Sequence, residues 1–284
     1  MVGRVTEIWR FPVKSMGGER LESCELGLLG IPGDRGWALR DETVGEIRGA
    51  KKLPALMMCS ARYVEEPTAS RVPPVAMTLP DGVELTSDDP AVPARLSELL
   101  GRPVTLWPRL PASDLDHYRR RAPDNPDLEQ ELRSVFGRMP DEPLPDLAVF
   151  PPEIFEYVAP LGTYFDAYPL HLLTSASVDA LAEGTPGASF DRRRFRANFL
   201  LEPTDGASGF VEREWCGREF RLGRARIKVD IPTARCVMTT LPQPGLPKDP
   251  SVLRAIVRGG QDLGVYATLV EPGEVRVGDG LVPL

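Results

Sequence analysis

Apolar and polar positions alternate with the two-residue period of β-strands along most of the first third of the chain. Turn residues separate these runs, and Asp81-Gly82 supplies the positive φ that a tight hairpin turn needs. A helix is predicted at residues 93–100, where Gly101 ends it. The elements predict a small antiparallel β-barrel or sandwich. Its predicted strands lie at residues 2–9, 20–26, 37–40, 44–48, 75–79 and 83–86.

The pattern changes at residues 108–152, which are rich in Pro, Asp, Glu and Arg and poor in β-branched residues. One amphipathic helix is predicted there, at residues 128–136. This composition is typical of a linker or of a lid over a binding site, where it would set substrate specificity.

Strand patterns return after residue 163, together with a helix at residues 175–182. A second helix opens at Asp249, which can cap it, with Pro250 in the first turn. The predicted strands lie at residues 168–173, 195–201, 210–215, 218–222, 226–231, 265–270 and 275–277.

The predicted fold class is therefore mainly β with a few helices (α+β). We expect an N-terminal β-barrel or sandwich domain at residues 1–110, a linker or lid at 111–152 and a C-terminal β domain at 153–284.

Composition narrows the function classes. The 284 residues carry a net charge of −7, which argues against a dedicated nucleic-acid binder, although 29 of the 34 basic residues are arginine and local clusters can bind small anions. No apolar run approaches the ~20 residues of a membrane span, and residues 1–10 have no signal-peptide character. We expect a cytoplasmic protein with no membrane partner.

The cysteines and histidines limit the metal sites that the chain can build. The cysteine spacing contains no C-x-x-C pair and no ferredoxin-like run, and two histidines are too few for a three-histidine zinc. Phosphate-loop, dinucleotide-binding and nucleophile-elbow motifs are also missing. The residues in question are Cys24, Cys59, Cys216, Cys236, His117 and His171.

Two turns carry basic residues. Lys14 and Ser15 follow the first strand in a glycine-bordered turn, where they either bind an anion or form a solvated turn. Arg35 stands between Gly33 and Gly36, which by itself indicates a turn.

Residues 191–199 are predicted to be a strand with Arg194, Arg196 and Asn198 on one face. Two neighbouring guanidiniums repel each other unless an acid or a bound anion offsets them, and planar guanidinium forks suit phosphate. A surface ion-pair network explains the same pattern.

Cys236 follows a strand that ends near Pro232, and Arg235 stands beside it. A lone cysteine is usually a small buried apolar residue. An adjacent positive charge and the loop hydroxyls favour the thiolate, which is both a nucleophile and a soft-metal ligand.

Taken in order, five motifs resemble those of MOSC-domain proteins, the molybdenum-cofactor sulfurase C-terminal-like proteins. The resemblance spans nearly the whole chain and includes the N-terminal β-barrel domain of the amidoxime-reducing component family. The motifs are Pro12-Val13-Lys14-Ser15, Asp34-Arg35, Phe195-Arg196-Ala197-Asn198, Arg235-Cys236-Val237-Met238-Thr239-Thr240 and residues 266–279.

This resemblance implies a molybdenum cofactor (Mo-molybdopterin), with Cys236 as the protein ligand of the metal. It implies that the pterin and its phosphate are held by charge-assisted donors. Asp230 is the nearest acidic candidate for proton handling, or else it pairs with a cofactor-binding arginine. The implied cofactor-binding residues are Lys14, Ser15, Arg35, Thr174, Ser175, Arg194 or Arg196, Asn198, Arg235 and Tyr266.

The implied activity is the reduction of N-hydroxylated small molecules, such as hydroxylamines, N-hydroxylated bases and amidoximes. Because the chain has no ferredoxin-like cysteine run, electrons would come from a separate ferredoxin- or flavin-type reductase. Two alternatives stay open: a sulfur carrier with a persulfide on Cys236, and a non-catalytic carrier of the cofactor.

Overall fold

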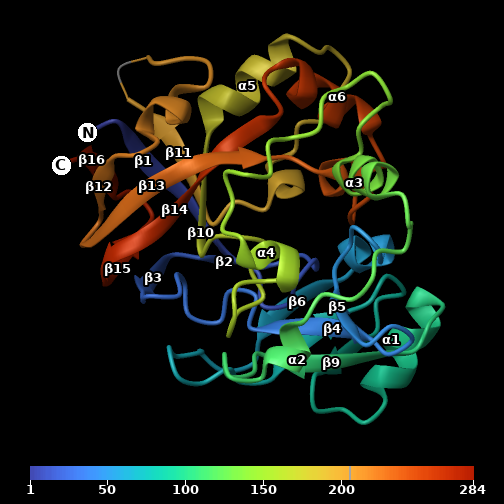
Figure 1. Cartoon of the computed structure of the whole chain (residues 1–284). Coiled ribbons are helices and arrows are strands. Elements are labelled where there is room, and N and C mark those ends of the chain that lie inside the picture. The colour runs from blue at the N-terminus through green and yellow to red at the C-terminus, as the bar shows by residue number, and fades with distance from the viewer. Residues whose placement is uncertain (205) are drawn as a thin grey trace.

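The computed structural model describes residues 1–204 and 206–284, and its largest element is a closed β-barrel (Figure 1). The ring closes because β1 pairs with both β16 and β11, so each of the seven ring strands has a partner on both sides. β2 (Glu19–Leu21) extends β1 outside the ring. In ring order the strands are β1 (Gly3–Arg10), β16 (Gly280–Pro283), β12 (Glu219–Leu222), β13 (Ala225–Ala234), β14 (Asp262–Glu271), β10 (Leu170–Thr174) and β11 (Phe199–Pro203).

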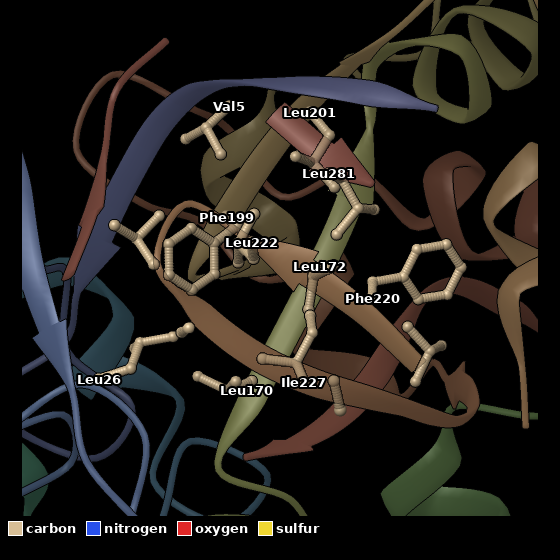
Figure 2. Close-up of a cluster of buried hydrophobic side chains, with 14 of the residues drawn as sticks. Val5, Leu26, Leu170, Leu172, Phe199, Leu201, Phe220, Leu222, Ile227 and Leu281 are labelled. Carbon is tan, nitrogen blue, oxygen red and sulfur yellow. The ribbon is translucent and has the colours of Figure 1, made fainter. Parts of the chain in front are cut away.

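Side chains alternate between the two faces of each strand, and those on the inner face fill the barrel interior, as Figure 2 shows. A short pair, β3 (Ser23–Leu26) with β15 (Gly273–Arg276), adds Leu26 and Val275 to the same core. The side chains labelled in Figure 2 are Val5, Leu26, Leu170, Leu172, Phe199, Leu201, Phe220, Leu222, Ile227 and Leu281.

The first strands belong to this barrel, although they lie in the segment predicted as a separate N-terminal domain. β1 is the strand that closes the ring, and such long-range pairing leaves no local signal in the sequence. The fold class is confirmed as mainly β with few helices. The boundaries at residues 110 and 152 stay a prediction.

A second β region packs around its own core beside the barrel (Figure 1). The helix α1 (Val92–Leu100) covers it, and Gly101 ends that helix in the left-handed conformation as predicted. Met238 and Leu241, from the far end of the sequence, complete the core, so the Cys236 loop lies where the two β regions meet. One sheet is β5 (Glu46–Arg48), β4 (Trp37–Asp41) and β9 (Val104–Pro108); the other is β6 (Ser60–Tyr63), β7 (Val75–Thr78) and β8 (Glu84–Thr86); η1 (Pro54–Met58) is a 3₁₀ helix.

The segment predicted as a linker or lid runs across the molecule between the two β regions (Figure 1). Its helix α3 (Leu128–Phe136) has the predicted bounds, because Asp127 caps it and Gly137 ends it at φ 61°. Glu131 pairs with Lys52 from the N-terminal part of the chain, and Glu142 pairs with Arg254 from the C-terminal part. These two ion pairs hold the segment against both parts of the molecule. The segment also contains α2 (Leu115–Tyr118), and α4 (Glu153–Glu156) follows directly after it.

Helices α5 (Ser175–Glu183) and α6 (Pro250–Arg258) lie together near one end of the barrel (Figure 1). Asp249 caps α6 by accepting from the N–H of Ser251, as predicted. No helix in the described part of the chain combines the length and apolar character of a membrane span.

Two predicted strands are wrong. Residues 192–195 form the 3₁₀ helix η2 (Arg192–Phe195), because the Asp191 carboxylate accepts the N–H of Arg193 at 2.9 Å and Arg196 then turns to φ 55°. Residues 211–215 form the 3₁₀ helix η3 (Val211–Trp215). The predicted single face of Arg194, Arg196 and Asn198 therefore does not exist.

Candidate functional site

Asp34 is a buried carboxylate that joins two of the predicted motifs. Its Oδ1 accepts the N–H of Phe11 at 2.7 Å, and its Oδ2 accepts from Arg35 and, at 3.0 Å, from Nδ2 of Asn198. Asn198 also accepts the N–H of His171 at 3.1 Å, which ties the group to β10. Sequence reasoning quoted Asp34 beside Arg35 but did not assign it this role.

Arg35 and Arg196 stand close to each other around the ring of Phe11. Their guanidinium carbons lie 5.2 and 4.2 Å from its centroid, and both residues adopt left-handed φ values of 48° and 55°. Arg196 donates to the carbonyl of Met16, yet its buried Nη2 has no partner among the described residues. Burial, together with the charge of Arg35, lowers the pKa of Arg196 to about 9. This charge is incompletely compensated.

Arg235 is a second buried arginine in the same situation. It donates to the carbonyl of Phe195 at 2.8 Å and approaches Nε2 of His171 at 3.4 Å. Its Nε has no partner in the described part of the chain, and burial lowers its pKa. Burial and the neighbouring arginines also keep the pKa of His171 well below its usual value, so this histidine is neutral and can accept from Arg235.

The turn after β1 adds Lys14 and Ser15. Lys14 donates to the carbonyl of Tyr164 and to the carboxylate of Asp166, both at 2.8 Å, and burial lowers its pKa. Burial alone would raise the pKa of Asp166, but Lys14 and Lys51 hold it well below its usual range. Ser15 has a φ of 71°, and its Oγ accepts the N–H of Ala50 at 2.9 Å.

Lys51 and Asp166 were missed by sequence reasoning. Lys51 stands in a local pair with Lys52, which is also the pattern of a solvated surface, and Asp166 has no local motif. Only their approach to each other, with Lys51 Nζ 3.9 Å from Oδ1 of Asp166, brings them to this region.

Cys236 directly precedes the 3₁₀ helix η4 (Val237–Thr240), at its N-cap position, and is half-buried. Its carbonyl accepts from Oγ1 of Thr239 at 3.0 Å. Within residues 1–204 and 206–284, no three His, Cys, Asp or Glu side chains group as a metal centre.

Arg194 binds the backbone of the loop that follows Cys236. The side chain is fully buried and donates to the carbonyls of Ser189 (2.9 Å), Thr239 (3.4 Å), Leu241 (3.1 Å) and Pro247 (2.7 Å). Every side-chain nitrogen of Arg194 thus has a partner, in contrast with Arg196. Of the two arginines that sequence reasoning could not separate, Arg196 is the one with a donor left for a ligand.

Tyr266 lies on β14 beside this group. Its ring stacks on Tyr168 with centroids 5.2 Å apart and is 5.8 Å from the ring of His171. Burial, with Asp166 adding to it, raises the pKa of Tyr266 to about 12, so the phenol keeps its proton.

Three other predicted residues have different surroundings. The Thr174 hydroxyl caps α5 and donates to Glu212 at 2.7 Å, and Ser175 is the first residue of that helix. Oδ2 of Asp230 accepts from the Thr268 hydroxyl at 2.9 Å, and Oδ1 lies 3.8 Å from Nζ of Lys228. Among the described residues, Asp230 therefore forms its ion pair with a lysine and not with a cofactor-binding arginine. Burial raises the pKa of Asp230.

The donor set fits an anionic group. Four cations, Lys14, Arg35, Arg196 and Arg235, lie near one another, and Arg235 directly precedes Cys236. Among the described residues, Asp166 pairs with Lys14, and Asp34 pairs with Arg35. Buried guanidinium N–H groups without partners are uncommon because each costs desolvation free energy. A phosphorylated ligand would supply the acceptors that Arg196 and Arg235 lack.

Comparison with known proteins identifies two domains. The MOSC N-terminal beta barrel domain matches residues 2–88, and the MOSC domain matches residues 162–282. Mitochondrial amidoxime reducing component 2 of Bos taurus is 25% identical over 304 residues, which cover 98% of this chain and 82% of that protein. Mitochondrial amidoxime-reducing component 1 of Mus musculus is 24% identical over 316 residues, covering 98% and 81%.

Among solved structures, the YUAD protein from Bacillus subtilis aligns over 99% of this chain and 94% of its own, with 12% identity and a TM-score of 0.43. The two domain matches confirm the resemblance that the sequence motifs indicated.

Proposed function

The chain is a MOSC-domain protein that also carries the MOSC N-terminal beta barrel domain, and on that premise we propose that it binds a molybdenum cofactor and reduces N-hydroxylated compounds. The amidoxime-reducing names of its relatives support the reaction class. One structural observation carries the proposal: two neighbouring buried arginines, Arg196 and Arg235, each keep an N–H without a partner in the described residues, and Arg235 directly precedes Cys236.

In this proposal the cations hold the cofactor. Arg196 and Arg235 donate to its phosphate and pterin oxygens, and Lys14 and Arg35 add charge. Asp34 fixes the direction of Arg35 by accepting its hydrogen bond, and Asn198 holds Asp34 in place. Because these partners are buried, the site is formed before the ligand arrives, which reduces the ordering cost of binding.

Cys236 supplies a thiolate ligand for the metal, and η4 fixes its position because Arg194 anchors the following carbonyls. When bound, the cofactor supplies the two-electron redox chemistry of N–O bond cleavage. Two electrons from a separate ferredoxin- or flavin-type reductase and two protons convert an N-hydroxylated substrate to its amine and water.

Cys236 binds the metal in this proposal, so the protons of the reaction come from another side chain. Tyr266 keeps its proton, with a pKa of about 12, and the raised pKa of Asp230 leaves that carboxyl as the acidic candidate. Of the two, Tyr266 is the one that packs against the site, since its ring lies 5.8 Å from the ring of His171.

The experiment loads the purified protein with cofactor and supplies a chemical reductant. We expect conversion of benzamidoxime to benzamidine and of N-hydroxylated adenine to adenine, and we expect Cys236→Ala to lose both turnover and molybdenum. Cys216→Ala is the matched control, because Cys216 is also half-buried and packs against the barrel core.

Three outcomes separate the alternatives. A loaded wild type that leaves both substrates untouched favours a non-catalytic cofactor carrier. A persulfide-sized mass increase on Cys236 without molybdenum favours a sulfur carrier. Equal molybdenum in wild type and Cys236→Ala removes Cys236 as the essential ligand.

A further inference from the structure

Arg138 is a buried arginine that the proposed function does not use. It follows α3 in the segment between the two β regions, and its side chain is 5% exposed. Its guanidinium donates to the carbonyl of Phe136 at 2.7 Å and to the carbonyl of Arg235 at 3.1 Å. Arg235 directly precedes Cys236.

The charge of Arg138 lacks a carboxylate partner among the described residues. The nearby acid Glu142 pairs with Arg254 instead, and Arg254 also donates to the carbonyl of Gly137. Nε of Arg138 is buried with no acceptor in the described part of the chain. Burial, together with the charge of Arg254, lowers the pKa of Arg138. A buried cation without a counter-charge is costly, so an anion nearby would offset it.

The turn that carries Arg138 touches both neighbours of Cys236. Arg138 binds the residue before it, and Gly137 packs against the residue after it. A Cβ built on Gly137 would lie 3.3 Å from Cβ of Val237 and 2.7 Å from Cδ2 of Leu253. Because Gly137 also has a φ of 61°, only glycine allows this close approach without strain.

We propose that Arg138 is a positioning residue for Cys236. Its guanidinium fixes the peptide that joins Arg235 to Cys236 and supplies the positive charge that an anionic, sulfur-bound metal group at Cys236 requires. The segment predicted as a linker or lid thereby forms a fixed wall of the site. This inference rests on the proposed cofactor binding, and it concerns retention and geometry of the metal group rather than the substrate.

A purely structural role for Arg138 makes a different prediction. If its two carbonyl contacts only hold α3 in place, removing it lowers stability but leaves the metal group unchanged. If its charge acts on the metal group, a lysine at this position restores part of the effect, although lysine cannot reproduce both hydrogen bonds of the planar fork.

The test compares cofactor-loaded wild type, Arg138→Met and Arg138→Lys. The readouts are molybdenum retained per chain over time in dialysis, the Mo(V) electron paramagnetic resonance signal, and the melting temperature. We expect Arg138→Met to lose molybdenum about tenfold faster with a shifted signal, because the variant removes the positive charge that offsets the anionic metal group. Arg138→Lys should fall between the two.

Arg48→Met is the matched control. Arg48 is also 5% exposed and also has a buried Nε without a partner, but its guanidinium pairs with Asp124 at 2.6 Å. We expect it to lower the melting temperature while molybdenum retention and the Mo(V) signal stay at the wild-type values.

Wild-type retention and an unchanged signal in Arg138→Met would overturn the inference, as would a lysine variant no better than the methionine variant. If Arg138→Met fails to fold, Arg138→Lys is compared with wild type instead. Faster molybdenum loss and a shifted Mo(V) signal in the lysine variant then support the inference, and wild-type values overturn it. A wild type that keeps its metal but reduces no N-hydroxylated compound defeats the proposed activity and leaves this inference standing. A wild type that cannot be loaded overturns both.

Discussion

Two buried polar clusters lie along β10, and they differ in how completely their hydrogen bonds are made. The first, which we call the capped cluster, consists of Thr174, Ser177 and Glu212. The second, the arginine cluster, consists of Arg35, Arg196 and Arg235 with Asp34, Asn198 and His171.

Every side-chain oxygen of the capped cluster has a partner. Ser177 donates to Glu212 at 2.6 Å, Thr174 donates to it at 2.7 Å, and the N–H of Ser177 donates to Thr174 at 3.2 Å. This pattern is that of a helix cap completed by a carboxylate.

The hydrogen bonding of the arginine cluster, in contrast, is incomplete. Arg196 and Arg235 keep buried donors without partners in the described residues, although both lie within reach of carbonyls and aromatic rings. The comparison teaches that burial and polarity alone do not mark a ligand site in this protein. What sets the arginine cluster apart is that two neighbouring cations both keep unpaired buried donors, whose free-energy cost a bound anion would remove.

The largest expected effect is that of Arg196→Gln on the arginine cluster. We expect the cofactor to dissociate about 10–100-fold faster, because hydrogen bonds to charged groups contribute about 1.5–3 kcal/mol. Stability of the cofactor-free protein should not fall, since an incompletely compensated buried charge is removed. Molybdenum retention and urea unfolding measure the two quantities.

Arg194→Gln is the neighbouring control for that variant. It removes a guanidinium whose nitrogens are all paired with carbonyls, so unfolding should occur at lower urea concentration. If Arg194→Gln and Arg196→Gln lose stability equally, the distinction between the two arginines is wrong.

The next effect is that of Thr174→Ala on the capped cluster. Loss of the helix cap and of the bond to Glu212 should lower the free energy of unfolding by about 1–2 kcal/mol. Molybdenum retention should stay at the wild-type value. A variant that loses the cofactor while its stability is unchanged would return Thr174 to the cofactor-binding set.

Acid should weaken the arginine cluster through His171. Its pKa in the folded protein is far below the ordinary value of about 6.5, so the unfolded chain binds more protons in that window. Stability of the cofactor-free protein therefore falls as the pH drops below about 6.5. His171→Gln should flatten the dependence of the unfolding free energy on pH, measured by urea unfolding between about pH 5 and 7. If the dependence is unaltered, other titrating groups cause it.

The smallest effect has the opposite sign and belongs to the capped cluster. Burial raises the pKa of Glu212, although hydrogen bonds from Ser177 and Thr174 oppose the shift. The folded protein then binds more protons than the unfolded chain, so this group lowers stability as the pH rises through its folded pKa. Glu212→Gln should remove that contribution in the same unfolding series, and a steeper dependence would contradict the assignment.

Local signals predicted a large part of the secondary structure. The helix at residues 128–136, the cap at Asp249 and the hairpin around Asp81-Gly82 are present because each depends on a few neighbouring residues. The predicted strand at residues 195–201 begins only at Phe199, because the cap at Asp191 and the left-handed Arg196 stop the extended chain before it.

The candidate site was predicted in part. Its motifs Lys14-Ser15, Arg35, Arg196, Asn198 and Arg235-Cys236 can be read from the sequence as single features. Their joint placement cannot, because Asp34 links Arg35 to Asn198 across 164 positions of the chain. Arg138, Lys51 and Asp166 have no local motif at all.

The sequence by itself determined that this chain is a mainly β protein with basic turns and a cysteine beside an arginine, since residue type and period suffice for that. Tertiary structure decided that β1 closes the C-terminal barrel, that Arg194 is fully paired and that Arg196 keeps a free donor in the described chain. The physical reason is that partners distant in sequence decide how completely a buried charge is compensated, and they meet only in the folded protein.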